Sequence, residues 1–114
     1  MNTYTQREAQ KKRRQQAMNN ELKTLKDLLT TGKYQGKIDV AISTQASQIM
    51  SRTRLVNPQI EAGEKFATLK TRGDTARAVI SFEGVESIST QNYYDGIGYF
   101  INYNGGNQLT AIFA

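Results

Sequence analysis

The chain has 114 residues and a mass of 12.8 kDa, enough for one domain with a small core under a polar surface. It contains no cysteine and no histidine, which excludes disulfides, zinc-thiolate sites and nucleophiles activated by histidine. We therefore expect a non-enzymatic protein with no catalytic residue, no metal site and no cofactor.

Charge is divided unevenly along the chain. Residues 1–57 carry eleven Lys and Arg against four Asp and Glu, whereas residues 58–114 carry four against six. This division predicts that the basic part of the molecule binds an anionic partner, while the other part forms most of the folded domain. No apolar run approaches the roughly 20 residues that span a bilayer. We expect no membrane partner, and a location in the host cytoplasm or within a virion.

The first predicted element is a long helix over residues 6–31. Thr5 and Glu8 have the spacing of a capping box, and Gly32 supplies a left-handed stop. An apolar stripe at helical spacing predicts that the second half docks on a core, and it consists of Met18, Leu22, Leu25 and Leu29. The first half has no such stripe. Residues 1–16 are therefore predicted to form a projecting helical arm.

This arm carries the best candidate for a functional patch. Its basic residues are Arg7, Lys11, Lys12, Arg13 and Arg14. Successive residues on a helix fan around its whole circumference, which suits phosphate contacts better than readout of base edges. The alternatives are contact with an acidic protein surface and a merely solvated charge run.

A second, shorter helix is predicted over about residues 44–55. Residues 38–42 fit either a strand or a helix, and Pro58 ends the helical region because the residue before a proline avoids the helical conformation. Arg52 and Arg54 extend the basic surface in this interpretation. A winged-helix arrangement remains open, with this segment as the recognition helix.

From residue 65 onward the pattern predicts strands. Residues 65–71 and 76–83 flank a turn cluster and form one hairpin, and residues 97–113 form another around Gly105 and Gly106. A two-residue turn there places Tyr103 opposite Gln108, Ile101 opposite Thr110 and Tyr99 opposite Ile112. Both faces of this hairpin then carry apolar groups, so a candidate interface is predicted at Tyr99, Ile101 and Tyr103.

The aromatic residues of this region also suit base stacking, as in proteins that bind unpaired strands. They are Tyr93, Tyr94, Tyr99, Phe100 and Tyr103. Stacked bases need nearby cations for their phosphates, and the sequence has no Lys or Arg between Ala78 and Ala114. On the sequence alone, packing or a protein interface is the favoured interpretation.

Together these signals predict a single α+β domain over residues 1–114. Its long N-terminal helix and second shorter helix pack on a four- to five-stranded antiparallel sheet, with helical residues 17–57 followed by β residues 58–114. The expected function is a small nucleic-acid-binding accessory protein. Its surplus of uncharged polar residues is a bias typical of phage and mobile-element proteins. The alternative is a phage protein-interaction module, either a structural component of the virion or an inhibitor that docks on a host complex. A homo-oligomer or a larger assembly is compatible with both functions.

Overall fold

The computed structural model describes residues 18–32, 34–44 and 49–114. These contain a helix over residues 18–29, a short 3₁₀ turn η1 (Arg72–Asp74) and eight strands. The strands are β1 (Lys37–Ser43), β2 (Ile49–Val56), β3 (Gln59–Ala62), β4 (Phe66–Lys70), β5 (Arg77–Ser81), β6 (Val85–Tyr93), β7 (Gly96–Tyr103) and β8 (Gln108–Phe113).

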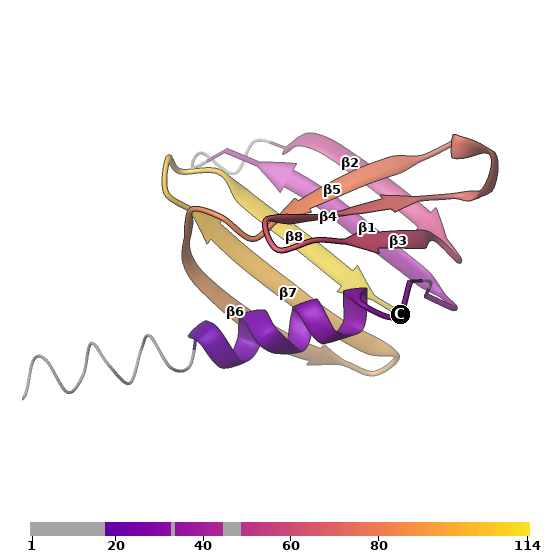
Figure 1. The fold of residues 1–114 in the computed structure, drawn as a ribbon. Helices are drawn as coiled ribbons and strands as arrows, with labels where there is room; N and C mark the ends of the chain where they lie inside the picture. Colours follow the sequence, from indigo (N-terminus) through magenta and orange to yellow (C-terminus); the bar gives the residue numbers. More distant parts are fainter. Residues whose placement is uncertain (1–17, 33, 45–48) are drawn as a thin grey trace, which may run out of the picture.

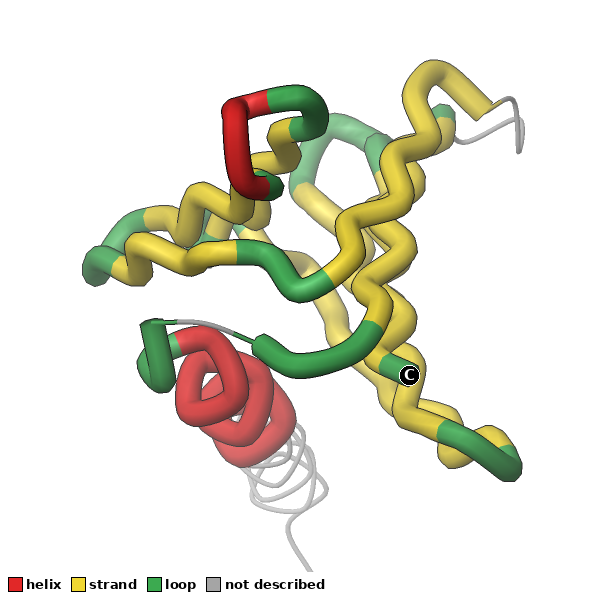
Figure 2. The backbone as a smooth tube through the Cα atoms, turned by 90° about the vertical axis from the view of Figure 1, so that its right-hand side faces the viewer, coloured by secondary structure: helices red, strands yellow, loops and turns green. Residues whose placement is uncertain are grey.

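The strands form two antiparallel sheets. The larger sheet has five strands in the order β2-β1-β8-β7-β6, and the smaller has three in the order β3-β4-β5. The helix and the smaller sheet lie side by side over the same face of the larger sheet (Figures 1 and 2). The molecule therefore has two layers, one of which is shared by a helix and a sheet.

The core lies between these layers. Two of its members, Leu25 and Leu29, come from the predicted helical stripe, and both are fully buried. The smaller sheet contributes Ile60, Ala67, Leu69 and Ile80, and the larger sheet contributes Ile38, Val40, Leu55, Ile88, Tyr99, Ile101, Leu109, Ala111 and Phe113. Tyr34 and Tyr99 pack edge-to-face on Phe113, with ring centroids 5.5 and 5.7 Å away. All the main elements thus meet in one hydrophobic cluster.

The predicted α+β class is wrong, because the protein is mostly β with one short helix in its described part. Residues 49–56, assigned to a second helix from sequence, are strand β2. The apolar positions of that segment fit helical spacing, but Thr53 and Leu55 face inward while Arg52 and Arg54 point outward. That period of two is the pattern of a half-buried strand, and the β-branched residues of β1 next to it favour the same state.

Of the helix predicted over residues 6–31, the structure describes residues 18–31, and the helical part there covers residues 18–29. In its described part, residues 18–29, two lysines are balanced by two acidic residues. The predicted stop is confirmed, since Gly32 has a left-handed φ of 79°. The predicted arm over residues 1–16 lies outside the described residues.

Both predicted hairpins are present, as β4–β5 and β7–β8, but the register of the second is wrong by one residue. Ile101 pairs with Leu109 and Tyr99 with Ala111. The reason is a three-residue loop, in which the Tyr103 amide donates to the Asn107 carbonyl (2.9 Å) and the Gly106 amide donates to the Tyr103 carbonyl (3.1 Å). The shift places Leu109 and Ala111 on the same face as Tyr99 and Ile101, which is the core face, and leaves Phe100 and Ile112 on the other face.

Candidate nucleic-acid interface

The larger sheet has one face on the core and one face that no described element covers (Figure 2). We call the second one the outer face. Residues directly opposite each other on paired strands share a face, so the register defines it as three rows across the sheet. The rows are Arg54, Asp39, Ile112, Gly98 and Gln91; Arg52, Ala41, Thr110, Phe100 and Ser89; and Ser43, Gln108, Asn102 and Ser87.

One side of the outer face is cationic. Arg52 and Arg54 stand on β2, the edge strand, and Lys37 lies on the neighbouring strand β1. Arg54 Nε donates to Asp39 Oδ1 at 3.0 Å, yet 60% of the Arg54 side chain remains exposed. Such exposed ion pairs contribute at most about 1 kcal/mol. The arginine therefore exchanges this partner for another anion at little cost.

The other side of the outer face is aromatic. Tyr93 on β6 and Phe100 on β7 flank Gly98, which has no side chain. A Cβ added at Gly98 would lie 2.9 Å from Tyr93 Cε2 and 3.3 Å from Phe100 Cε2, so both rings lie over the glycine. Tyr93 is 38% exposed and Phe100 is partly buried. The two rings form an apolar platform over Gly98, and Tyr94 is fully exposed in the adjoining turn.

The row next to this platform is polar and uncharged. Asn102 Nδ2 donates to Ser87 Oγ at 2.9 Å across the β6–β7 pair. A β-bulge sets both Glu86 and Ser87 against Asn102, because the register jumps between Val85 and Ser87. Bulges redirect a side chain. In this position the bulge places Glu86 beside a polar pocket that Asn102 and Gln108 also line.

The structure describes two of the seven residues that the sequence predicted as nucleic-acid contacts. Arg52 and Arg54 lie together on the outer face. The other predicted phosphate contacts lie outside the described residues: Arg7, Lys11, Lys12, Arg13 and Arg14. The predicted interface residues Tyr99 and Ile101 are in the core, at 2% and 0% exposure. The observed register sets the buried residues Leu109 and Ala111 opposite them, which makes this face part of the core, so they offer no surface to a partner.

Tyr103, the third predicted interface residue, joins the two sheets. Its hydroxyl donates to the Ser81 carbonyl on β5 at 2.6 Å. Burial raises the pKa of Tyr103 from 10.0 to about 12, since the phenolate is poorly solvated there. The hydroxyl therefore has a structural partner, and the residue is part of the packing between the layers.

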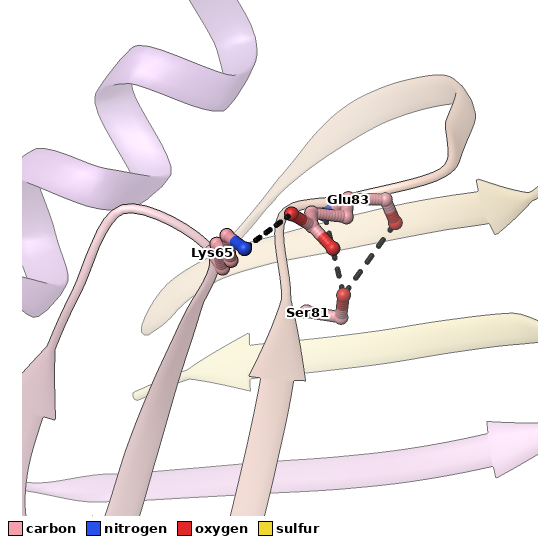
Figure 3. A network of polar contacts seen from close by, with 3 residues as sticks. All are labelled: Lys65, Ser81 and Glu83. Atoms are coloured by element: carbon pink, nitrogen blue, oxygen red, sulfur yellow. Dashed lines mark hydrogen bonds and ion pairs between the residues drawn. The ribbon is translucent and has the colours of Figure 1, made fainter.

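The smaller sheet presents a competing surface. Phe66 and Val79 are 52% and 45% exposed on the face of that sheet opposite the core. Beside them, Lys65 Nζ lies 4.0 Å from Glu83 Oε1, and Ser81 Oγ accepts from the Glu83 amide at 3.2 Å (Figure 3). These contacts fasten the end of β5 to the β3–β4 turn. They are highly exposed, so we interpret them as turn-stabilising contacts and not as a binding site.

Phe100 and Tyr93 stand out in the sequence as aromatic residues, but no cation lies near them along the chain. The arginines come from β2, far earlier in the chain, and only the pairing of β1 with β8 brings them into the same sheet. The one local signal was the alternation of Arg52 and Arg54 with inward residues, which places both on one face of a strand.

Among the described residues, none forms a helix with the length and apolar character that a membrane crossing requires. Comparisons of the chain with protein-family models, with curated proteins and with solved structures give no match. What the protein does must therefore be inferred from the chemistry of the outer face.

Proposed function

We propose that this protein binds single-stranded nucleic acid, without catalysis, on the outer face of its five-stranded sheet. One observation carries the proposal: an arginine-bearing edge strand and an aromatic platform occupy the same face of the same sheet. Arg52, Arg54 and Lys37 contact phosphates, and Phe100 and Tyr93 stack unpaired bases.

The two halves of the face have the spacing that a short strand needs. Arg52 and Phe100 lie in the same row, separated by three strand spacings, or roughly 14 Å at about 4.8 Å each. Sheets that bind RNA stack two or three bases on exposed aromatic residues, while cations along the surface follow the backbone. The dimensions of the outer face fit a segment of that length.

The shape of the face favours an unpaired strand over a duplex. Tyr93 and Phe100 stand on strands within a five-stranded sheet, whereas reading a major groove requires a helix or a two-stranded ribbon that enters it. A base that leaves its stack can instead lie flat on Phe100. The only anionic residue in the three rows is Asp39, which is already paired with Arg54. Away from Glu86 at the pocket, the face therefore offers little repulsion to phosphates.

The N-terminal basic run stays a prediction from the sequence. Its residues would add phosphate contacts that do not depend on base sequence. The experiment below separates its contribution from that of the sheet.

The test is a fluorescence anisotropy titration of labelled single-stranded DNA, single-stranded RNA and duplex DNA at several salt concentrations. Three phosphate contacts on a single strand predict a slope of log K against log salt near −2, and the N-terminal run makes it steeper. Replacing Phe100 by Ala should weaken single-strand binding by about 1–3 kcal/mol. Replacing Lys11, Lys12, Arg13 and Arg14 by Ala should flatten the salt slope while keeping the effect of Phe100→Ala.

Phe66→Ala is the matched control. It removes an aromatic ring of the same kind, 52% exposed, from the other sheet. We expect this variant to bind as the original protein does. Equal losses in the Phe66 and Phe100 variants, tighter binding of duplex than of single strands, or binding independent of salt would overturn the proposal.

A second candidate is a protein-interaction module, favoured by the exposure of Phe66 and Val79 on the smaller sheet. Thr68 shares a face of β4 with Phe66 and pairs with Val79 on β5. The side chains of Phe66 and Val79 are therefore diagonal neighbours on that face. Light scattering of the purified protein tests a homo-oligomer formed through this face. A dimer that dissociates on Phe66→Glu would support it, and a monomer at high concentration would count against it.

A further inference from the structure

The polar pocket at one end of the outer face has a volume of about 270 Å³. Its walls come from the β6 bulge, from the end of strand β7, and from the loop before β8 and the start of β8. They include Glu86, Ser87, Asn102, Asn107 and Gln108. Small-molecule sites begin at about 300 Å³. A pocket at this lower limit suits one planar heterocycle of the size of a nucleobase.

The position of the pocket relates it to the platform. Asn102 follows Phe100 by two residues on β7, and both side chains are on the outer face. Two residues of a strand span about 6.6 Å. A strand whose base stacks on Phe100 therefore brings the neighbouring base to the mouth of the pocket.

The polar groups of the pocket define which base fits. Glu86 is an exposed carboxylate and can only accept hydrogen bonds when ionised. Asn102 uses one amide N–H on Ser87, which fixes its orientation and leaves a second N–H and the amide oxygen. Gln108 and Asn107 add further amide donors and acceptors. A ligand must thus present two adjacent donors to the carboxylate and an acceptor to the amides.

We propose that this pocket selects guanine in single-stranded nucleic acid, an inference that rests on the proposed function. Guanine is the base whose Watson–Crick edge has two adjacent donors, N1–H and the N2 amino group, followed by the O6 acceptor. The two donors pair with the Glu86 carboxylate, and O6 accepts from an amide N–H of Asn102 or Gln108. Adenine, cytosine and thymine each offer a single donor position on that edge, so the carboxylate is left half-satisfied with them.

The β-bulge gives this arrangement its physical basis. If the register of residues 87–93 continued, Glu86 would lie opposite Tyr103 and point to the core face, because successive side chains of a strand point to opposite faces. The bulge places Val85 opposite Tyr103 instead. The bulge brings a carboxylate to an otherwise uncharged polar row. A carboxylate repels phosphates, so its place is beside a base and not beside the backbone.

The experiment compares four labelled oligothymidines that differ only in one central base, G, A, C or T, in anisotropy titrations. We expect the oligonucleotide with G to bind at least about fivefold more tightly, as one good bidentate pair provides. Inosine lacks the N2 amino group and should lose most of this preference. Glu86→Gln should lower the affinity for the oligonucleotide with G to that of the other three.

Glu83→Gln is the matched control, because it removes a nearby exposed carboxylate whose ion pair with Lys65 lies outside the pocket. This variant should keep the preference for G. Equal binding of all four oligonucleotides by the original protein would overturn the guanine pocket and leave single-strand binding standing. The same holds if Glu86→Gln keeps the preference. Failure of every oligonucleotide to bind would overturn both proposals.

Discussion

The two faces of the five-stranded sheet are made from alternate residues of the same strands, yet they differ in almost every property. On the core face, Ile38, Ile101 and Phe113 are at most 1% exposed and make the packing that holds the layers together. On the outer face, one residue away along each strand, arginines, small residues and two aromatic rings meet the solvent. Because the side-chain period is two, stability and binding are set by interleaved residues and can be altered separately.

The largest effect is expected on the core face. Phe113→Ala removes a ring that is 1% exposed and that packs edge-to-face on both Tyr34 and Tyr99. Truncations of this kind cost about 3–5 kcal/mol, so the free energy of unfolding should fall by that amount. Urea denaturation followed by far-UV circular dichroism measures it. A loss below about 1 kcal/mol would mean that the core is not where we describe it.

The matched change on the outer face is Phe100→Ala, which should reduce the affinity for single strands more than the stability of the fold. Its ring is only partly buried and lies over Gly98, so unfolding should become easier by about 1 kcal/mol or less. Single-strand affinity should fall by about 1–3 kcal/mol. Measuring both quantities on the same preparation sharpens the contrast. If stability falls more than affinity, the outer ring is a packing residue and the two faces do not differ in role.

A smaller effect is expected where the two layers meet. Tyr103→Phe removes the hydrogen bond to the Ser81 carbonyl and should cost about 1 kcal/mol near neutral pH. The raised pKa of Tyr103, about 12 against 10.0 for a free phenol, adds a pH dependence. The stabilisation is complete below pH 10 and is lost as pH rises from 10 towards 12, because the unfolded chain ionises first.

Urea midpoints of the original protein and of Tyr103→Phe between pH 8 and about 11.5 test this dependence. The difference between the two should shrink as pH rises above 10. A constant difference would show that the hydroxyl is solvated in the folded state.

The smallest effect concerns the single acidic residue in the three rows. Asp39→Asn breaks the 3.0 Å ion pair with Arg54, and exposed pairs of this kind contribute about 0.2–1 kcal/mol. Stability should therefore fall by about 1 kcal/mol at most. Affinity for single strands should rise about twofold, since Arg54 then meets phosphate without a competitor. Weaker binding in this variant would contradict the assignment of Arg54 to the phosphates.

Local signals in the sequence predicted the parts of the fold that depend on neighbours in the chain. The apolar stripe ending at Leu29, the stop at Gly32 and the two later hairpins are all present. Segments whose state depends on distant partners were mispredicted. Residues 49–56 fit helical spacing as well as strand spacing, and their pairing with β1 decides between the two. The second hairpin was predicted one residue out of register, because a run of two glycines fits a two-residue or a three-residue loop equally.

The candidate site could not be predicted from the sequence, because it also depends on partners that are distant in the chain. Phe100 has no Lys or Arg near it in the sequence, and Arg52 has no aromatic residue near it. Their relation arises from a sheet order in which β8 lies between β1 and β7. No spacing rule within one segment encodes that order.

The bulges in the two edge strands have one more consequence. β6 is irregular at Glu86 and β2 is irregular opposite Ile42 and Ser43, so both borders of the five-stranded sheet are interrupted at the same end. A continuous free edge invites pairing with the edge of another molecule, and an interrupted, arginine-bearing edge does not. The sheet can thus keep one face uncovered at high protein concentration and still resist growth into fibrils.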